Sequence, residues 1–301
     1  MSDQAAALRE MISSLRTERT EPTATNDRGG TSGGTARIVA VTSGKGGVGK
    51  SNFTLNFALE LQKLGRKVLV FDADIGMANI DVLMGVRSQY NLIHLLKREK
   101  SLTEIIQTGP NSLPFIAGGS GFTELFSLSE DDLLYFTKQI EEIAHEMDVI
   151  LFDTGAGLSK ETIRFITASD ECIVVTTPEP TAITDAYALV KVVHDMEDAA
   201  SFRLVVNRAS DRREAQQTSD KIRLVAEKFL HLDIPVLGYV SDDPHVSQAV
   251  KKQTPFSIRF PNSQASKDIQ ELAFRYTQNS LQVQADSPKG IKRFIRRLLN
   301  R

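Results

Sequence analysis

The segment Gly44–Ser51 has the residue types and spacing of a phosphate-binding loop. It reads GKGGVGKS and fits the pattern GxxxxGK[ST], directly after a short apolar run and before a helical segment. Its backbone N–H groups and the following helix N-terminus supply positive potential, while Lys50 can reach the β- and γ-phosphates and Ser51 can bind Mg²⁺. The predicted nucleotide contacts in this loop are Gly44, Lys45, Gly46, Gly47, Val48, Gly49, Lys50 and Ser51.

Three aspartates can supply carboxylates beside this loop. Asp72 and Asp74 end the run VLVFDAD, and Asp153 ends the apolar part of VILFDTGAG. A single aspartate after a strand commonly caps a helix, but here three aspartates fall at carboxyl ends of strands, on the side where the phosphate loop opens. Gly155 and Gly157 allow the loop after Asp153 to move with a γ-phosphate.

Strands and helices must position these residues, and the sequence from Arg37 onward indicates both. Short apolar runs alternate there with segments whose apolar residues have helical periodicity. The runs are Ile38–Thr42, Val68–Phe71, Leu113–Ala117, Val149–Phe152, Cys172–Thr176, Leu204–Val206 and Val236–Val240. The helical segments are Asn52–Leu64, Glu130–His145, Ala182–Glu197, Glu214–Phe229 and Ser266–Thr277. This alternation predicts a single α/β P-loop domain with a mostly parallel sheet and helices on both faces.

The composition favours a cytoplasmic protein. The chain has 301 residues and a net charge of −2, so we expect no nucleic-acid partner. Its one cysteine, Cys172, excludes a disulfide within the chain and lies in an apolar run that indicates the core. No apolar run approaches the ~18 residues of a membrane span, and the N-terminus has no signal-peptide pattern.

The two ends of the chain differ from this domain. Residues 1–20 include a short helical stretch, and residues 21–36 are rich in Gly, Thr and Ser, which indicates a flexible linker. The predicted ATPase domain covers 37–280, and 281–301 form a linker and a basic helix.

The last thirteen residues, KGIKRFIRRLLNR, combine an apolar stripe with six basic and no acidic side chains. This pattern predicts a helix that binds an anionic membrane surface, the stripe being Ile291, Phe294, Ile295, Leu298 and Leu299. So short a helix is marginal in water, and we expect it to order only on lipid. Two tails on one dimer would bind ~10²-fold better than one. Docking on the domain and a nucleic-acid arm are the alternatives.

The loop KGGVGKS resembles the deviant Walker A of the MinD/ParA class of ATPases. The resemblance implies that Lys45 crosses a dimer interface to the partner's phosphates, so that ATP binding and homodimerisation are one event. It also implies that Asp74 positions the attacking water, that Asp72 lies near the Mg²⁺ shell, and that Asp153 holds Mg²⁺ through water. The implied catalytic residues are Lys45, Lys50 and Asp74.

The base is predicted to be adenine, with ATP and ADP as the nucleotides. A Ras-type GTPase would have Asn-Lys-x-Asp after a late strand, where this chain has Val205-Val206-Asn207-Arg208. Asn207 resembles the adenine-contacting Asn of the MinD class, and Ser241–Pro244 resembles its second base-lining loop. The implied contacts in these two loops are Asn207, Arg208, Ser241 and Asp243.

Two features resemble the flagellar branch of this class, the FlhG (FleN, YlxH) family. The segment Asp153–Gly157 reads DTGAG where MinD proteins commonly have Asp-x-Pro-Ala-Gly. An Asp-Gln-Ala-x-x-Leu-Arg helix of that family stimulates the GTPase FlhF, and its residues here are Asp3, Gln4, Ala5, Leu8 and Arg9. The resemblance implies a switch that regulates flagellar number or placement with FlhF and flagellar C-ring proteins.

Other members of the class remain alternatives. A Min-type regulator of the division site suits the core and tail equally, but not the Asp3–Arg9 segment. A DNA-partition protein needs a basic core surface, and here the basic excess is in the tail. An iron–sulfur carrier needs two cysteines per chain, and a tyrosine-kinase relative would end in a tyrosine cluster.

Overall fold

A computed structural model describes residues 36–74, 79–118, 130–196, 201–282 and 290–299, which belong to one compact unit. The predicted partner segment, with Asp3, Gln4, Ala5, Leu8 and Arg9, lies outside the described residues, and so does nearly all of the predicted linker 21–36. The assignments made to these two segments therefore stay predictions.

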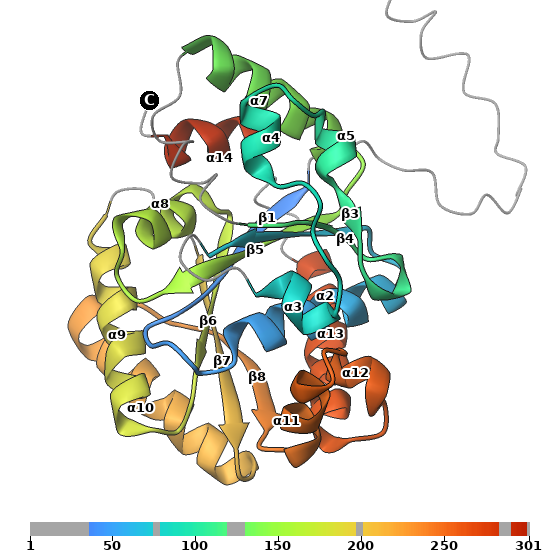
Figure 1. The fold of residues 1–301 in the computed structure, drawn as a ribbon. Coiled ribbons are helices and arrows are strands. Elements are labelled where there is room, and N and C mark those ends of the chain that lie inside the picture. Colours follow the sequence, from blue (N-terminus) through green and yellow to red (C-terminus); the bar gives the residue numbers. More distant parts are fainter. Residues whose placement is uncertain (1–35, 75–78, 119–129, 197–200, 283–289, 300–301) are drawn as a thin grey trace, which may run out of the picture. The chain divides into compact units, whose positions relative to one another are not determined.

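The described strands form one sheet in the order β3-β4-β2-β5-β1-β6-β7-β8 (Figure 1). All pairings are parallel except that of β3 with β4. The strands are β1 (Arg37–Ser43), β2 (Val68–Ala73), β3 (Gln107–Thr108), β4 (Pro114–Ile116), β5 (Val149–Ala156), β6 (Glu171–Thr176), β7 (Ser201–Ala209) and β8 (Val236–Ser241). The predicted mostly parallel sheet is confirmed, and the seven predicted runs each form a strand.

Helices cover both faces of this sheet, as predicted. One face packs on α2 (Lys50–Lys63) and α13 (Gln264–Gln282), together with the short helices α3 (Ile80–Met84), α11 (Pro244–Lys251) and α12 (Phe256–Arg259). The other face packs on α7 (Glu130–Ala144), α8 (Lys160–Ala168), α9 (Pro180–His194), α10 (Arg212–Leu230) and α14 (Gly290–Leu298), with α4 (Leu92–Leu96) and α5 (Leu102–Ile105). A 3-10 turn, η1 (Pro110–Ser112), joins β3 to β4.

The amino ends of the central strands carry a buried ionic cluster. Glu171, at the start of β6, is fully buried and pairs with Arg37 of β1 at 3.0 Å and with Arg203 of β7. The Tyr276 hydroxyl of α13 donates a hydrogen bond to Glu171 at 3.2 Å. Burial, helped by the Glu171 charge, raises the pKa of this tyrosine well above its usual value. The cluster ties three strands to α13 at the edge opposite the phosphate loop.

The predicted core cysteine is confirmed. Cys172 lies in β6 and is completely buried between the sheet and the helices α9 and α10. Burial raises the pKa of its thiol far above the usual range.

Candidate nucleotide site and the docked C-terminal helix

The carboxyl ends of β1, β2 and β5 surround a pocket of about 760 Å³. This is the edge where ligands bind in open parallel sheets. The lining residues come from the phosphate loop, from the carboxyl ends of β2, β5 and β7 with the residues that follow β2 and β5, and from α3, α8 and α11. They include Gly46, Gly47, Gly49, Lys50, Ser51, Asp74, Asn79, Val82, Gly155, Thr162, Arg208 and Val250. The pocket therefore brings the predicted phosphate loop and Asp74 together.

The phosphate loop ends at Gly49, the N-cap of the long helix α2. Gly49 has φ of 91°, and a Cβ there would lie 2.3 Å from the Asn207 side-chain nitrogen. Only glycine satisfies both the left-handed backbone and this close approach. The loop thus presents its N–H groups and the helix N-terminus to the pocket, which is the geometry of an anion site.

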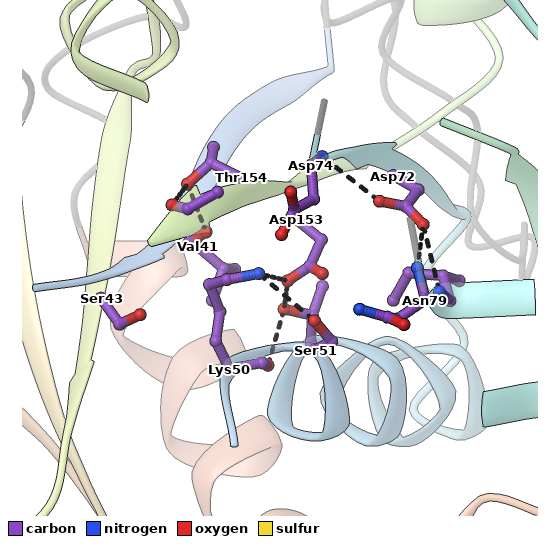
Figure 2. Close-up of polar contacts among 12 residues, drawn as sticks. Val41, Ser43, Lys50, Ser51, Asp72, Asp74, Asn79, Asp153 and Thr154 are labelled. Atoms are coloured by element: carbon purple, nitrogen blue, oxygen red, sulfur yellow. Dashed lines mark hydrogen bonds and ion pairs between the residues drawn. The ribbon is translucent and has the colours of Figure 1, made fainter. Parts of the chain in front are cut away.

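Lys50 and Asp153 form a buried ion pair at the base of the pocket (Figure 2). The Lys50 Nζ lies 3.0 Å from Asp153 Oδ1 and 3.3 Å from the Ser51 hydroxyl oxygen. The buried Thr54 of α2 donates to the same Asp153 oxygen at 2.7 Å. The lysine that is predicted to bind phosphate is therefore paired with the carboxylate that is predicted to hold Mg²⁺.

Asp72 points toward α3 and is engaged with backbone groups (Figure 2). Its Oδ2 accepts hydrogen bonds from the N–H groups of Asn79 at 2.9 Å and Ile80 at 3.1 Å, and its Oδ1 from that of Asp74 at 3.3 Å. Burial first, and then the nearby Asp153 charge, raise the pKa of Asp72 to about 7. Asp72 thus fixes the start of α3, and its assignment to the Mg²⁺ shell stays a prediction.

Lys45 does not line the pocket. Its ammonium lies 3.1 Å from Glu179 Oε2 and 2.9 Å from Thr181 Oγ1, both at the start of α9. The preceding Gly44 is pressed against α9, because a Cβ there would lie 2.2 Å from the Asp185 carbonyl carbon. The loop backbone is thus fixed on α9 while the Lys45 side chain turns away from the phosphate site of its own chain.

Of the four residues predicted to contact the base, only one is among those that line the pocket. Arg208 lines the pocket, and the Asn207 side-chain N–H donates to the Val48 carbonyl at 2.7 Å. The Asp243 carboxylate accepts hydrogen bonds from the N–H groups of His245 at 2.9 Å and Ala265 at 3.2 Å. Burial alone would raise the pKa of Asp243, but these hydrogen bonds and the His245 ring outweigh it and lower it.

Ser241 has a structural contact of its own, since its N–H donates to the Asp268 carboxylate of α13 at 2.8 Å. Asp243 and Ser241 therefore order the loop between β8 and α11. Neither residue lines the pocket.

Mg²⁺ coordination fits two side chains here. The Ser51 hydroxyl lines the pocket, and Asp153 Oδ2 is buried without a hydrogen-bond partner among the described residues. A buried carboxylate oxygen left in that way is suited to a cation or to its bound water. Within the described ranges, no group of three or more His, Cys, Asp or Glu side chains could hold a metal ion.

The C-terminal helix α14 lies against α7 and α8 (Figure 1). Ile291, Phe294, Ile295 and Leu298 are buried, and Leu299 packs against the same cluster. The expectation that this helix orders only on lipid differs from the structure, where the domain covers the apolar stripe. Tertiary packing here supplies the stability that a short helix lacks alone.

Two contacts fix α14 on elements that carry the site. The Phe294 ring stacks on Phe152, the residue before Asp153, with ring centroids 4.7 Å apart. The Arg297 guanidinium donates to the Thr167 carbonyl at 3.4 Å, near the end of α8. Among the described helices, none is long and apolar enough to span a bilayer.

Comparisons with known proteins agree with this fold. A family of AAA domains (AAA_31) matches residues 36–206. The antiactivator FleN of Pseudomonas aeruginosa is 33% identical over 87% of this chain and 93% of its own length. The flagellum site-determining protein YlxH of Helicobacter pylori is 37% identical over 88% of this chain and 90% of its own.

Solved structures of cell-division ATPases have the same fold. The MinC:MinD complex of Aquifex aeolicus matches with a TM-score of 0.66 and 25% identity, over 81% of this chain and 96% of that one. MinD of Pyrococcus horikoshii in complex with Mg-ADP matches with a TM-score of 0.65 and 23% identity, over 81% and 97%.

The fold, the phosphate loop and these relatives place the chain in the MinD/ParA class of P-loop ATPases. Within that class it is similar to FleN and YlxH, the branch also called FlhG.

Several residues that shape the site were not predicted from the sequence. Glu179 and Thr181 are 134 and 136 residues from Lys45 along the chain, so only the fold brings them together. Thr54 could have been found, because it lies one helical turn after Lys50 and therefore faces the same side. Asn79 contacts Asp72 through its backbone, which no residue type signals.

Proposed function

We propose that this ATPase is a switch that dimerises around ATP, hydrolyses it slowly and regulates flagellar number or placement at the cell membrane. The position of Lys45 carries the proposal. Its ammonium is turned away from the chain's own phosphate pocket, on the exposed surface beside it. A lysine inside a phosphate loop that contributes nothing to its own pocket is suited to act on a partner's nucleotide.

Asn207 supports adenine as the base. Its amide nitrogen is used by the Val48 carbonyl, so its oxygen remains as a hydrogen-bond acceptor. The exocyclic amine of adenine can donate to that oxygen, whereas guanine presents a carbonyl at the same ring position. The same contact ties base recognition to the phosphate loop.

ATP binding rearranges the base of the pocket. The γ-phosphate competes with Asp153 for Lys50, which lies 3.0 Å from the carboxylate. Ser51 and the released Asp153 would hold Mg²⁺, which when bound neutralises charge on the β- and γ-phosphate oxygens. Asp74 lines the pocket, with its Oδ1 3.8 Å from the place a Cβ on Gly155 would take, and orients the attacking water. The reaction therefore uses side chains that the fold holds close together.

Dimerisation then requires Lys45 to exchange partners. Its ion pair with Glu179 is largely exposed, and such pairs contribute about 0–1 kcal/mol. The partner's γ-phosphate offers a charge-assisted contact that is stronger than this pair. The lysine is thus held weakly enough to leave α9 when a partner loaded with ATP is present.

The test compares Lys45→Ala with Lys50→Ala in an Asp74→Ala background, by sedimentation and nucleotide binding. Asp74→Ala alone is expected to form a lasting dimer with ATP and to release phosphate at least ~100-fold more slowly. Adding Lys45→Ala should leave a monomer that still binds ATP, whereas Lys50→Ala should lose the nucleotide. A dimer that persists without Lys45 would contradict the proposal.

The basic helix α14 is suited to attach the protein to a membrane, provided that it first leaves the domain. Because Phe294 and the rest of the stripe are buried on the domain, α14 must leave this position before it can enter lipid. Its groove includes Phe152 and α8, which lie immediately before and after the loop that follows Asp153. Movement of that loop with the nucleotide can therefore weaken or strengthen docking.

The flagellar role rests on the similarity to FleN and YlxH, with FlhF and C-ring proteins as partners. Placement of the division site is the second candidate, because MinD of Bacillus subtilis is 29% identical over 84% of this chain. A pull-down of FlhF with the full chain and with a chain lacking residues 1–20 separates them. Capture that depends on residues 1–20 supports the flagellar role, and no capture by either chain favours the division role.

A further inference from the structure

Thr54 is a buried hydroxyl group that contacts the acid at the base of the pocket. It lies one turn into α2 and has no exposed surface. Its Oγ1 is 2.7 Å from Asp153 Oδ1 and 3.0 Å from the Lys50 carbonyl oxygen. A threonine hydroxyl has a single hydrogen to donate, so it serves one of these acceptors at a time.

The carboxylate is the better acceptor of the two. A hydroxyl that donates to the carbonyl four residues earlier is a common local feature of helices and needs no further role. Donation to an ionised carboxylate is stronger and shorter, and the 2.7 Å contact is the shorter one here. The geometry therefore favours Asp153 as the hydrogen-bond partner of Thr54.

The two oxygens of Asp153 have different surroundings. Oδ1 contacts both Lys50 and Thr54, whereas Oδ2 is buried and has no hydrogen-bond partner within the described part of the chain. If Lys50 moves to phosphate, Thr54 remains as the side chain that holds Oδ1. Rotation about the last torsion of an aspartate is otherwise soft, because its energy profile is broad and two-fold.

We propose that Thr54 is a positioning residue for Mg²⁺ binding, whose hydroxyl holds Asp153 so that Oδ2 faces the metal shell once Lys50 has left. This inference rests on the proposed nucleotide function and adds a residue to it. The role does not require Thr54 to touch the metal, the nucleotide or the water.

The test uses Thr54→Val, which keeps the shape and removes the hydroxyl, and Thr54→Ser, which keeps the hydroxyl. The affinity for a fluorescent ADP analogue is measured for each variant with Mg²⁺ and again with EDTA. The ratio of the two affinities reports the contribution of the metal, without any hydrolysis. Thr54→Val is expected to reduce this ratio about 10–100-fold, the usual loss when the partner of a metal-binding carboxylate is removed. Its EDTA affinity should stay unchanged, and Thr54→Ser should keep the wild-type ratio.

Thermal unfolding without nucleotide shows whether a variant has lost stability, which would indicate a merely structural role. Thr54→Ala is a second variant without the hydroxyl. A wild-type ratio in either hydroxyl-free variant overturns the proposal, and so does an equal loss of affinity with Mg²⁺ and with EDTA. If wild-type protein binds the analogue with no help from Mg²⁺, the proposed nucleotide function fails in its metal part, and Thr54 has no role there. A dimer that survives Lys45→Ala leaves the Thr54 result unaffected.

Discussion

The phosphate edge of the sheet and the face that holds α14 differ in the kind of contact that must break before each can bind something else. At the phosphate edge charged side chains pair with one another, Lys50 with Asp153 and Lys45 with Glu179. At the α14 face an apolar stripe is covered by apolar neighbours, with Phe294 stacked on Phe152. Polar contacts are exchanged for those of a specific charged ligand. The apolar neighbours of a stripe, in contrast, can be replaced by any other apolar surroundings.

This difference determines how selective each region can be. Full burial of one large apolar side chain contributes about 1.5–3 kcal/mol, whether the cover is protein or lipid. The two environments of the stripe are therefore close in free energy, and a small change in the groove can decide between them. The Lys50–Asp153 pair, in contrast, lies in a pocket whose shape and charge suit phosphate. We therefore expect the phosphate edge to be specific for its ligand, and the docking of α14 to depend on changes at the phosphate edge.

The largest expected effect comes from deleting residues 289–301. We expect complete loss of flotation with anionic vesicles, because the basic side chains and the apolar stripe are both removed. Nucleotide binding should persist, but the melting temperature should fall, because Phe152 and its neighbours lose the cover that Phe294 gives them. Vesicle flotation and calorimetry measure the two outcomes. A truncated protein that still floats would refute the role of the tail in membrane binding.

The next effect concerns the phosphate edge and is a dependence of stability on pH. Burial and the Asp153 charge raise the pKa of Asp72 to about 7 in the folded protein, against 3.8 for an ordinary aspartate. Between these values the folded state keeps a proton that the unfolded state has lost, so the free energy of unfolding falls as the pH rises. The loss amounts to about 3 kcal/mol between pH 5 and pH 8.

Asp72→Asn should flatten this dependence, because an amide does not ionise. Urea unfolding at pH 5 and pH 8, with EDTA and without nucleotide, measures it. If wild type and variant lose stability equally over this range, the titrating group lies elsewhere.

The smallest effect distinguishes docking from lipid contact within α14. Arg297 donates to the Thr167 carbonyl, whereas Arg296 is exposed, so Arg297→Gln and Arg296→Gln remove the same charge from different surroundings. Each lost charge should weaken binding to anionic vesicles by about 1 kcal/mol, roughly 5-fold. Arg297→Gln also loosens docking and should recover part of this loss. Equal vesicle affinities for the two variants would show that the docked state does not compete with lipid.

The phosphate edge could be predicted from the sequence largely because its chemistry is local. Gly44–Ser51 is one contiguous segment, and Asp74 and Asp153 each end an apolar run. The fold class followed from the same alternation of runs and helices. Local sequence did not specify which hydrogen-bond partners each side chain has. Asp72 accepts hydrogen bonds from backbone N–H groups at the start of α3, and Asp243 caps α11.

The tail shows the other limit of sequence reasoning. Its pattern identified the helix and the stripe, with Phe294 and Ile295 on the apolar side. The same pattern describes a helix on lipid and a helix on a domain. The choice depends on whether an apolar groove exists elsewhere in the fold. Here α7, α8 and Phe152 form that groove, and all three lie far from the tail in the sequence.

Cys172 has a practical consequence for experiments on this molecule. The chain has no other thiol, and burial together with its raised pKa keeps this one un-ionised and out of reach of maleimide dyes at neutral pH. A cysteine engineered at Arg296 would therefore take up a fluorophore selectively, without prior removal of the native one. Such a labelled protein would report the departure of α14 from its groove in real time, in the presence of vesicles and nucleotide.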